Sequence, residues 1–382
     1  MKGRRLLPAA IMTLALAVCP AGRGGRAPDE IRGTNRCLVI GYDHFTSMPD
    51  TAPCSANNVE IMAALLSDYT PETERVIRRV DGPGTGEELE ELIRDTFRNA
   101  GEADTSYVYL STHGVAWAED GAERMAFLLC DGTAETELEP ARLREMLDAV
   151  PGRKVLILDA CHSGAALAAF DGPEYRVMAS GRADEDSYFW MSGPDRDTGT
   201  GYFTSALDGA LRASLREQID PDGDGRVTMA ELRARTGEIY GASDAQWLTG
   251  GADDALFSLP EEPQCEERIR GLTFDGLTRE EDTLVLSFRF SLDEATRMEY
   301  RIVTRKDGKW DFENASRLPD RERTGTVRGL LSPGDKTRKI RISADSLGEE
   351  GTVLLQIISL RGLHGQVPVL EASRRISADG AE

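Results

Sequence analysis

The feature that most constrains the fold is a series of short, continuously apolar segments separated by amphipathic ones. Residues 37–42 (CLVIGY), 107–111 (YVYLS) and 154–159 (KVLILD) are apolar almost throughout. Between them, 55–69 and 140–150 carry apolar residues at helical spacing. Strands without a polar face are typical of a parallel sheet covered by helices on both sides, so an α/β fold is predicted.

Further elements fit the same alternation. Residues 75–80 and 176–180 are strand candidates, and 203–215 is a helix candidate. Ser55 is available to cap the first helix, and Thr85 with Glu88 fits a capping box at the start of another. We therefore expect one mostly parallel sheet over residues 34–260.

The hydrophobic pattern of the sequence changes from about residue 266. Strand-length segments with turn residues between them follow one another to residue 378, which predicts an all-β, sandwich-like accessory domain over 266–378. The boundary is expected near 260–263. The segments are 283–290, 299–304, 338–343 and 352–359.

The net charge of this chain is strongly acidic. Its 382 residues carry a formal charge of −21, and 40% of them are hydrophobic. A nucleic-acid-binding protein needs a basic surface, so that partner class is excluded, and no segment after the N-terminus is apolar enough to span a membrane. The charge therefore indicates a soluble globular protein whose acidic surface can attract cationic segments of a substrate.

The N-terminus has the pattern of an export signal. Lys2, Arg4 and Arg5 precede an apolar stretch over 6–18, and we assign 1–27 to a signal peptide and linker. Cys19 could belong to a lipoprotein motif, but the bulky Val18 before it fits that motif poorly. We expect a secreted or cell-envelope-associated protein, with plain export favoured over a lipid anchor.

Five cysteines remain after Cys19, and an odd number leaves at least one free thiol in an exported chain. No Cys-x-x-Cys pair is present, and only four histidines occur, so a zinc site is not expected. The five are Cys37, Cys54, Cys130, Cys161 and Cys265.

Two of the expected strands end in reactive residues. His113-Gly114 follows the strand over 107–111, and Cys161 follows the strand over 154–159. The carboxyl ends of parallel strands lie at one edge of a sheet, where active sites gather. An imidazole there can deprotonate a thiol, and the main-chain N–H groups of Gly114 and Cys161 can hold an oxyanion. His162 is the competing base, but as the neighbour of Cys161 it is expected to point away from the thiol.

These segments resemble the His-Gly and Asp-x-Cys-His-Ser-Gly motifs of metacaspases and bacterial caspase-family peptidases, relatives of clostripain and legumain. His113 precedes Cys161 by 48 residues, close to the caspase separation. The resemblance covers about residues 34–260. It implies a caspase-like fold and a cysteine endopeptidase that works through a thioester. Its other motifs are 39–43, 57–59, 179–187 and 201–204.

The same resemblance implies cleavage after Arg or Lys. Asp184 lies where the metacaspase pattern has an acidic pocket residue, and Asp159 could face the pocket from its strand end. A carboxylate matches a guanidinium group in charge and geometry. In caspase-type enzymes the region after the nucleophile is often cut during maturation, so self-cleavage near Arg182 or Arg196 is a further hypothesis.

Residues 220–231 (DPDGDGRVTMAE) fit the twelve-residue EF-hand loop. Calcium is therefore the expected cofactor, with Gly225 at the tight turn. No second loop of this kind is evident, so a structural clip and a regulatory switch both remain open. The predicted ligands are Asp220, Asp222, Asp224, the Arg226 carbonyl and Glu231.

One alternative from another functional class stays open. The chain could be a catalytically silent caspase-like module that binds partners through its β-rich C-terminal domain, and a cell-envelope ligand of that domain is possible. An intact Cys/His pair favours the enzyme, because a binding module need not keep both residues.

Overall fold

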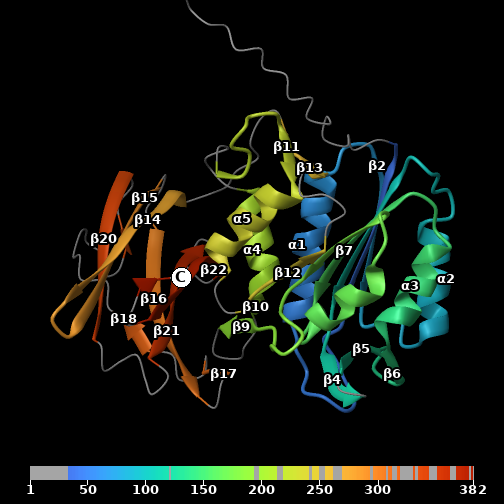
Figure 1. Ribbon diagram of the computed structural model, residues 1–382, viewed down its shortest axis with the longest axis horizontal. Helices are drawn as coiled ribbons and strands as arrows, with labels where there is room; N and C mark the ends of the chain where they lie inside the picture. Colours follow the sequence, from blue (N-terminus) through green and yellow to red (C-terminus); the bar gives the residue numbers. More distant parts are fainter. Residues whose placement is uncertain are drawn as a thin grey trace, which may run out of the picture.

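A six-stranded sheet lies at the core of the N-terminal part of the computed structural model, on the right in Figure 1. Its strand order is β12-β8-β7-β3-β1-β2, and all strands are parallel except β12 at one edge. The strands are β1 (Asn35–Gly41), β2 (Thr73–Val80), β3 (Thr105–Ser111), β7 (Arg153–Asp159), β8 (Tyr175–Ala179) and β12 (Gln246–Leu248). The prediction of a mostly parallel sheet is confirmed, and β12 is an additional strand that the periodicity did not indicate.

The structure describes residues 33–381 with gaps. The segments outside the described residues are 1–32, 120–121, 193–197, 213–217, 241–242, 249–253, 261–268, 293–295, 307–308, 312–315, 319–329, 332–333, 344–350, 362–366, 378–379 and 382. The expected signal peptide and Cys19 therefore lie outside the described residues, as do Arg196 and Cys265. Among the residues that are described, no helix is long and apolar enough to cross a bilayer.

Helices cover both faces of the central sheet, as the apolar strands require. One face packs against α1 (Cys54–Tyr69), α4 (Tyr202–Leu211) and α5 (Met229–Ile239). The other face packs against α2 (Gly86–Thr96), α3 (Pro140–Asp148) and the 3₁₀ helix η1 (Ser163–Phe170). Alternate residues of one strand enter different cores: Tyr109 of β3 faces α1 and α4, whereas Val108 faces the opposite side.

The start of α1 differs from the expectation. The helix begins at Cys54, so Ser55 lies inside it and is not its cap. Asp43, in the loop after β1, accepts hydrogen bonds from the main-chain N–H groups of Ser55 (2.8 Å) and Ala56 (3.0 Å). A carboxylate from the loop before the helix thus caps it and ties it to the end of β1. At α2, Thr85 does cap the helix, while Glu88 reaches Gly84 and not Thr85.

Small antiparallel elements accompany the central sheet. A three-stranded sheet follows β3 directly, and a β9–β10 hairpin precedes α4. Another short pair, β11–β13, flanks α5. The bounds are β4 (Gly114–Glu119), β5 (Ala122–Cys130), β6 (Glu135–Leu138), β9 (Phe189–Ser192), β10 (Thr198–Gly201), β11 (Arg226–Thr228) and β13 (Ala255–Ser258).

The C-terminal part consists of two antiparallel sheets packed face to face, which confirms the expected β-sandwich. One sheet has the order β14-β15-β20, and the other is built around β16-β21-β22. Their bounds are β14 (Ile269–Glu280), β15 (Thr283–Leu292), β16 (Thr296–Lys306), β17 (Lys309–Trp310), β18 (Ser316–Leu318), β19 (Leu330–Leu331), β20 (Gly334–Ser343), β21 (Thr352–Arg361), β22 (Val367–Ser377) and β23 (Gly380–Ala381).

The two parts of the chain share an apolar core. Helices α4 and α5 lie between the central sheet and β22 (Figure 1), and the C-terminal sandwich packs against them. Leu354 and Ile358 of β21 belong to the same buried cluster as Phe203 and Leu207 of α4. At its margin, Arg375 pairs with Asp244 (3.2 Å). The sandwich thus supports the helices that form one wall of the candidate site.

Candidate active site

Strand register brings His113 and Cys161 to the same edge of the sheet. Strands β3 and β7 are parallel neighbours, and Ser111 pairs with Asp159 at their carboxyl ends. His113 and Cys161 each follow two residues after these paired positions. Two chain segments that leave adjacent parallel strands at the same level must run side by side, so the register places the imidazole and thiol segments next to each other.

Gly114 makes that approach close. A Cβ atom built on Gly114 would lie 1.9 Å from the carbonyl oxygen of Cys161, a distance that no side chain can occupy. The start of β4 therefore packs directly on the main chain of the nucleophile. Any larger residue at position 114 would push the two segments apart, so only glycine fits this position.

The imidazole of His113 is half-buried and held from one side. Its Nε2 lies 2.9 Å from the Pro49 carbonyl oxygen, and its ring packs at 4.6 Å on that of Phe45. A carbonyl oxygen only accepts hydrogen bonds, so Nε2 carries the proton. In the neutral ring, Nδ1 is then the basic nitrogen.

Cys161 differs from the other described cysteines in exposure. It is partly exposed, whereas Cys37, Cys54 and Cys130 are buried, and no disulfide joins any of these four. Burial raises the pKa of the Cys37 and Cys54 thiols to about 12, which leaves them inert. The sulfur of Cys161 accepts a hydrogen bond from the main-chain N–H of Ser187 (3.3 Å).

His162 is engaged away from the nucleophile. Its backbone is left-handed, with φ of 59°. Its Nδ1 lies 2.9 Å from the Ala183 carbonyl oxygen, and its Nε2 lies 3.5 Å from the Asp186 carboxylate. Both ring nitrogens therefore face the loop after β8, in line with the expectation that His162 points away from the thiol.

Asp159 ends β7 as a buried carboxylate. Thr204 of α4 donates to its Oδ2 (2.7 Å), and Tyr109 of β3 lies 3.4 Å from the same oxygen. Burial raises the pKa of Asp159 to about 6, and it raises the pKa of Tyr109 so far that the phenol stays a donor. Within the described residues, no Lys or Arg forms an ion pair with Asp159.

Three residues near Asp159 were not named individually from the sequence. Asn58 donates to Ser111 (3.1 Å) and accepts from the N–H of Gly201 (2.8 Å). A Cβ on Gly201 would lie 2.6 Å from Oδ2 of Asp159, so the main chain of Gly201 packs directly on the carboxylate. Asn58 and Gly201 do fall in the motifs 57–59 and 201–204, the signal that could have identified them.

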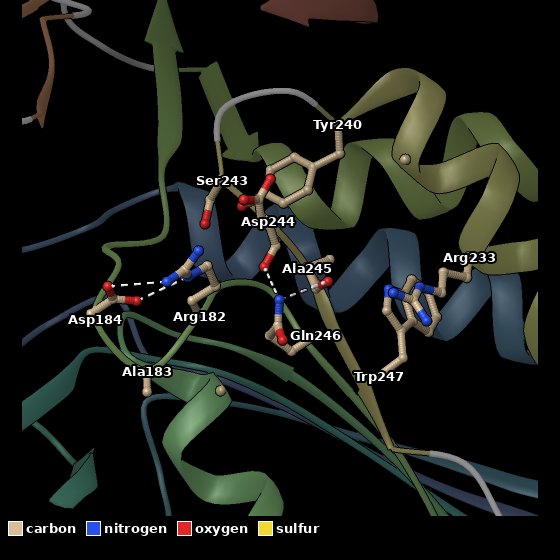
Figure 2. Close-up of a pocket in the computed structure, with 12 residues that line it drawn as sticks. Arg182, Ala183, Asp184, Arg233, Tyr240, Ser243, Asp244, Ala245, Gln246 and Trp247 are labelled. Atoms are coloured by element: carbon tan, nitrogen blue, oxygen red, sulfur yellow. Dashed lines mark hydrogen bonds and ion pairs between the residues drawn. The ribbon is translucent and has the colours of Figure 1, made fainter. Parts of the chain in front are cut away.

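Asp184 lies elsewhere, on the exposed loop after β8. Its carboxylate forms a two-pronged contact with Arg182 (3.0 and 3.3 Å), shown in Figure 2. Both residues line a cavity of about 650 Å³ together with Trp247 of β12 and Arg233 of α5. The residues that line this cavity do not include Cys161, His113 or Asp159. This cavity therefore does not hold both of the predicted pocket carboxylates.

The predicted calcium loop has three carboxylates close together. Oxygen atoms of Asp220, Asp222 and Asp224 lie within 4.8 Å of one another, so this triad could hold an ion. Glu231 instead forms a capping box with Thr228 at the start of α5 (2.8 Å). It would have to leave that position to act as a ligand. Among the described residues, no other cluster of potential metal ligands occurs.

Comparisons with solved structures return distant likenesses. GSU0716 from Geobacter sulfurreducens is 13% identical, with 60% of this chain and 96% of that chain covered and a TM-score of 0.41. The Drosophila initiator caspase Dronc is 10% identical, with 60% and 85% covered and a TM-score of 0.38. A secreted C11 cysteine protease from Bacteroides thetaiotaomicron is 13% identical, with 48% and 55% covered and a TM-score of 0.30.

Sequence comparison gives the assignment. No curated protein matches the chain. The profile of the family described as "Caspase domain" matches residues 34–255, more than half of the chain and the whole central sheet. Its span contains His113, Gly114, Asp159 and Cys161. This chain therefore belongs to the caspase family, whose domain is usually a cysteine peptidase.

Proposed function

We propose that this protein is an exported cysteine endopeptidase that cleaves after Arg or Lys, with Cys161 as nucleophile and His113 as base. The observation that carries the specificity is the buried carboxylate of Asp159, which has no cationic partner in the described chain and lies two residues from Cys161. Buried charges in proteins are usually paired. A basic substrate side chain supplies the missing partner.

The chemistry begins with proton transfer. His113 holds its Nε2 proton against Pro49, so Nδ1 takes the proton of the Cys161 thiol. The thiolate attacks the scissile carbonyl carbon, and the main-chain N–H groups of Gly114 and Cys161 hold the resulting oxyanion. Collapse of the tetrahedral intermediate breaks the C–N bond, and His113 protonates the leaving amine.

A thioester on Cys161 remains after the amine departs. His113, neutral again, takes a proton from water, and the hydroxide attacks the thioester carbonyl. The second tetrahedral intermediate releases the carboxylic product, and the thiolate regains its proton from His113. Nothing is oxidised or reduced, and the enzyme returns to its starting state.

Specificity resides at Asp159 in this proposal. The side chain of Asn58 bonds to Ser111, and the main chain of Gly201 packs against the Asp159 carboxylate. The guanidinium of a substrate arginine then forms a charge-assisted hydrogen bond with Asp159. Asp184 remains the second candidate from the sequence, but it would first have to release Arg182.

The alternative proposal is a silent module that binds partners through its C-terminal sheets. β22 packs against α4 and α5, so one face of the C-terminal sandwich is covered within the chain. This packing reduces the surface that the sandwich can offer to a partner. A cell-envelope ligand would therefore have to use the outer sheet β14-β15-β20. The partly exposed Cys161 favours the enzyme.

The test is covalent labelling. The mature protein is treated with a peptidyl acyl-transfer probe that carries Arg before the reactive group, and the labelled residue is mapped by mass spectrometry. We expect label on Cys161, with loss in His113→Ala and retention in His162→Ala. The matched probe with Asp before the reactive group is expected to label at least 100-fold more slowly, since it would meet Asp159 with a like charge.

Each outcome has a consequence. Labelling by the Asp probe in preference to the Arg probe would refute the proposed specificity. Absence of label on Cys161 with either probe would favour the silent module. The same samples report self-processing: a wild-type chain that is cut after Arg182 or Arg196, and a Cys161→Ala chain that stays intact, would support maturation by self-cleavage. Signal cleavage and release from the cell test export.

Calcium binding at residues 220–231 is a further part of the proposal. The Asp220, Asp222 and Asp224 oxygens provide a site for a hard cation, and the Arg226 carbonyl and Glu231 would complete it. The strand of this loop, β11, pairs with β13. A bound ion would therefore join α5 to this strand pair, which favours a structural clip over a switch.

Calorimetry on the full mature chain tests this site. We expect uptake of one calcium ion and a rise in melting temperature of a few degrees, since ligand binding to the native state stabilises it. Asp222→Asn with Asp224→Asn should abolish both effects, and magnesium should give a weaker response. Calcium uptake that persists in the double variant would exclude this loop.

A further inference from the structure

Beside the nucleophile, three serines and the main chain of Ala160 form a hydrogen-bonded cluster. Ser163 and Ser180 are fully buried, and Ser187 is partly buried. Ser163 follows Cys161 in the turn after β7, whereas Ser180 and Ser187 belong to the segment after β8. The cluster thus joins the turn that carries the nucleophile to the loop that runs past it.

Three of its hydrogen bonds close a ring. The N–H of Ala160 donates to Ser180 Oγ (3.1 Å), and Ser187 Oγ donates to the Ala160 carbonyl (2.9 Å). The two hydroxyls lie 2.5 Å apart. Ser180 Oγ also lies 3.1 Å from the Ala160 carbonyl oxygen, so both hydroxyls can donate to that carbonyl. Every polar group of the ring then has a partner, which makes its geometry well defined.

The ring fixes the position of one main-chain N–H. The amide of Ser187 lies 3.3 Å from Sγ of Cys161, and the Ser187 carbonyl oxygen lies 3.6 Å from the same sulfur. An amide N–H is a strong donor, and a thiolate accepts it better than a thiol does. The longer contact, in which S–H would donate to the carbonyl, is weaker because S–H is a poor donor. The balance favours the thiolate.

We propose that Ser187 is a positioning residue for the nucleophile: its hydroxyl, locked to Ala160 and Ser180, holds its main-chain N–H against the sulfur of Cys161 and stabilises the thiolate. The inference rests on the proposed function in taking Cys161 as the nucleophile. It adds a source of thiolate stabilisation that is independent of His113. Ser163 lies outside the ring, 3.3 Å from Ser180, and takes no part in it.

Alkylation of Cys161 by iodoacetamide, followed from pH 5 to 9 and mapped by mass spectrometry, tests the proposal on the full mature chain. Only the thiolate reacts, so the midpoint of the rate profile reports how readily the thiol ionises. In Ser187→Ala we expect the midpoint to move up by about one pH unit, with a rate about tenfold lower at pH 6, since a hydrogen bond to a charged group is worth about that much.

Three further variants complete the design. Ser163→Ala is the matched control, with a profile equal to that of the wild type. Ser187→Thr keeps the hydroxyl and should restore the wild-type profile. Ser180→Ala opens the ring from its other side and should reproduce the shift, which provides a second reading if Ser187→Ala does not fold. Thermal unfolding of each variant accompanies the alkylation.

Wild-type profiles in folded Ser187→Ala and Ser180→Ala would overturn the proposal, and so would loss of folding in both, which would assign the ring to structure alone. This result is separable from failure of the proposed function, because alkylation needs no substrate. A chain that shows the expected shifts but cleaves no peptide would contradict the peptidase and leave the role of Ser187 standing.

Discussion

Asp159 and Asp184 are two carboxylates of similar promise in the sequence, and the fold treats them in opposite ways. Asp159 is buried at the end of β7, with neutral donors around it and no cationic partner in the described chain. Asp184 is exposed and paired with Arg182. Its neighbouring cation lowers the pKa of Asp184, whereas burial raises the pKa of Asp159.

The difference shows which of the two carboxylates can gain free energy by binding a substrate cation. An ionised carboxylate buried without a cation destabilises the fold, and a substrate cation can relieve that cost. A carboxylate already paired at the surface has little to gain from a substrate. The raised pKa of Asp159 and the ion pair of Asp184 therefore point to different roles in substrate binding.

The largest expected effect is on cleavage after Arg. Asp159→Asn should lower kcat/KM for an Arg substrate by about 100- to 1,000-fold, because loss of one partner of a buried charge pair costs about 3 to 4 kcal/mol. The measurement is hydrolysis of a fluorogenic peptide. Cleavage of the peptide with citrulline, a neutral analogue of Arg, should change far less. An equal loss on both peptides would mean that Asp159 supports the fold of the site and not its specificity.

The second effect is on stability: Asp159→Asn, which lowers activity, should make the folded protein more stable. The pKa of Asp159 is about 6 in the fold against an ordinary 3.8, so the neutral form is favoured by folding and ionisation destabilises the protein as pH rises. The penalty is absent below pH 3.8 and complete above pH 6. At pH 7.5, Asp159→Asn should raise the free energy of unfolding by up to about 3 kcal/mol. Denaturant unfolding at pH 7.5 and pH 4 checks this, and a variant less stable at pH 7.5 would contradict it.

The third effect is a pH dependence of selectivity. Between pH 7.5 and pH 5 about nine tenths of the Asp159 carboxylate becomes protonated, so the preference for Arg over citrulline should fall about tenfold. The ratio of the two peptides removes any pH effect that acts on both of them equally. If the preference for Arg over citrulline stays constant across this pH range, a group other than Asp159 binds the arginine side chain of the substrate.

The smallest effect is expected at the exposed residue. Asp184→Asn removes a surface pair with Arg182 and should change kcat/KM for Arg peptides by less than about fivefold. It serves as the matched control for Asp159→Asn, because it makes the same chemical change on a charge of the same sign. A loss larger than that of Asp159→Asn would reverse the comparison and return the pocket to the loop after β8.

Much of the fold was readable from the sequence. The apolar strands over 37–42, 107–111 and 154–159 predicted the core of the sheet, because a strand with no polar face must be covered on both sides. Strand β12 was not predicted, because a strand of three residues at a sheet edge is too short to show a hydrophobic periodicity. The cap of α1 also escaped it, because Asp43 reaches that helix from another element.

By itself the sequence determined the fold class, the family, and the pairing of a His-Gly segment with a Cys segment at two strand ends, because these depend on local pattern and order along the chain. Tertiary structure alone decided which carboxylate is buried without a cation and which thiol is exposed. It also decided which N–H faces that thiol. Those properties arise from contacts between residues far apart in the sequence, such as Thr204 with Asp159 and Ser187 with Cys161. A local sequence pattern does not predict such contacts, because they form only when the chain packs.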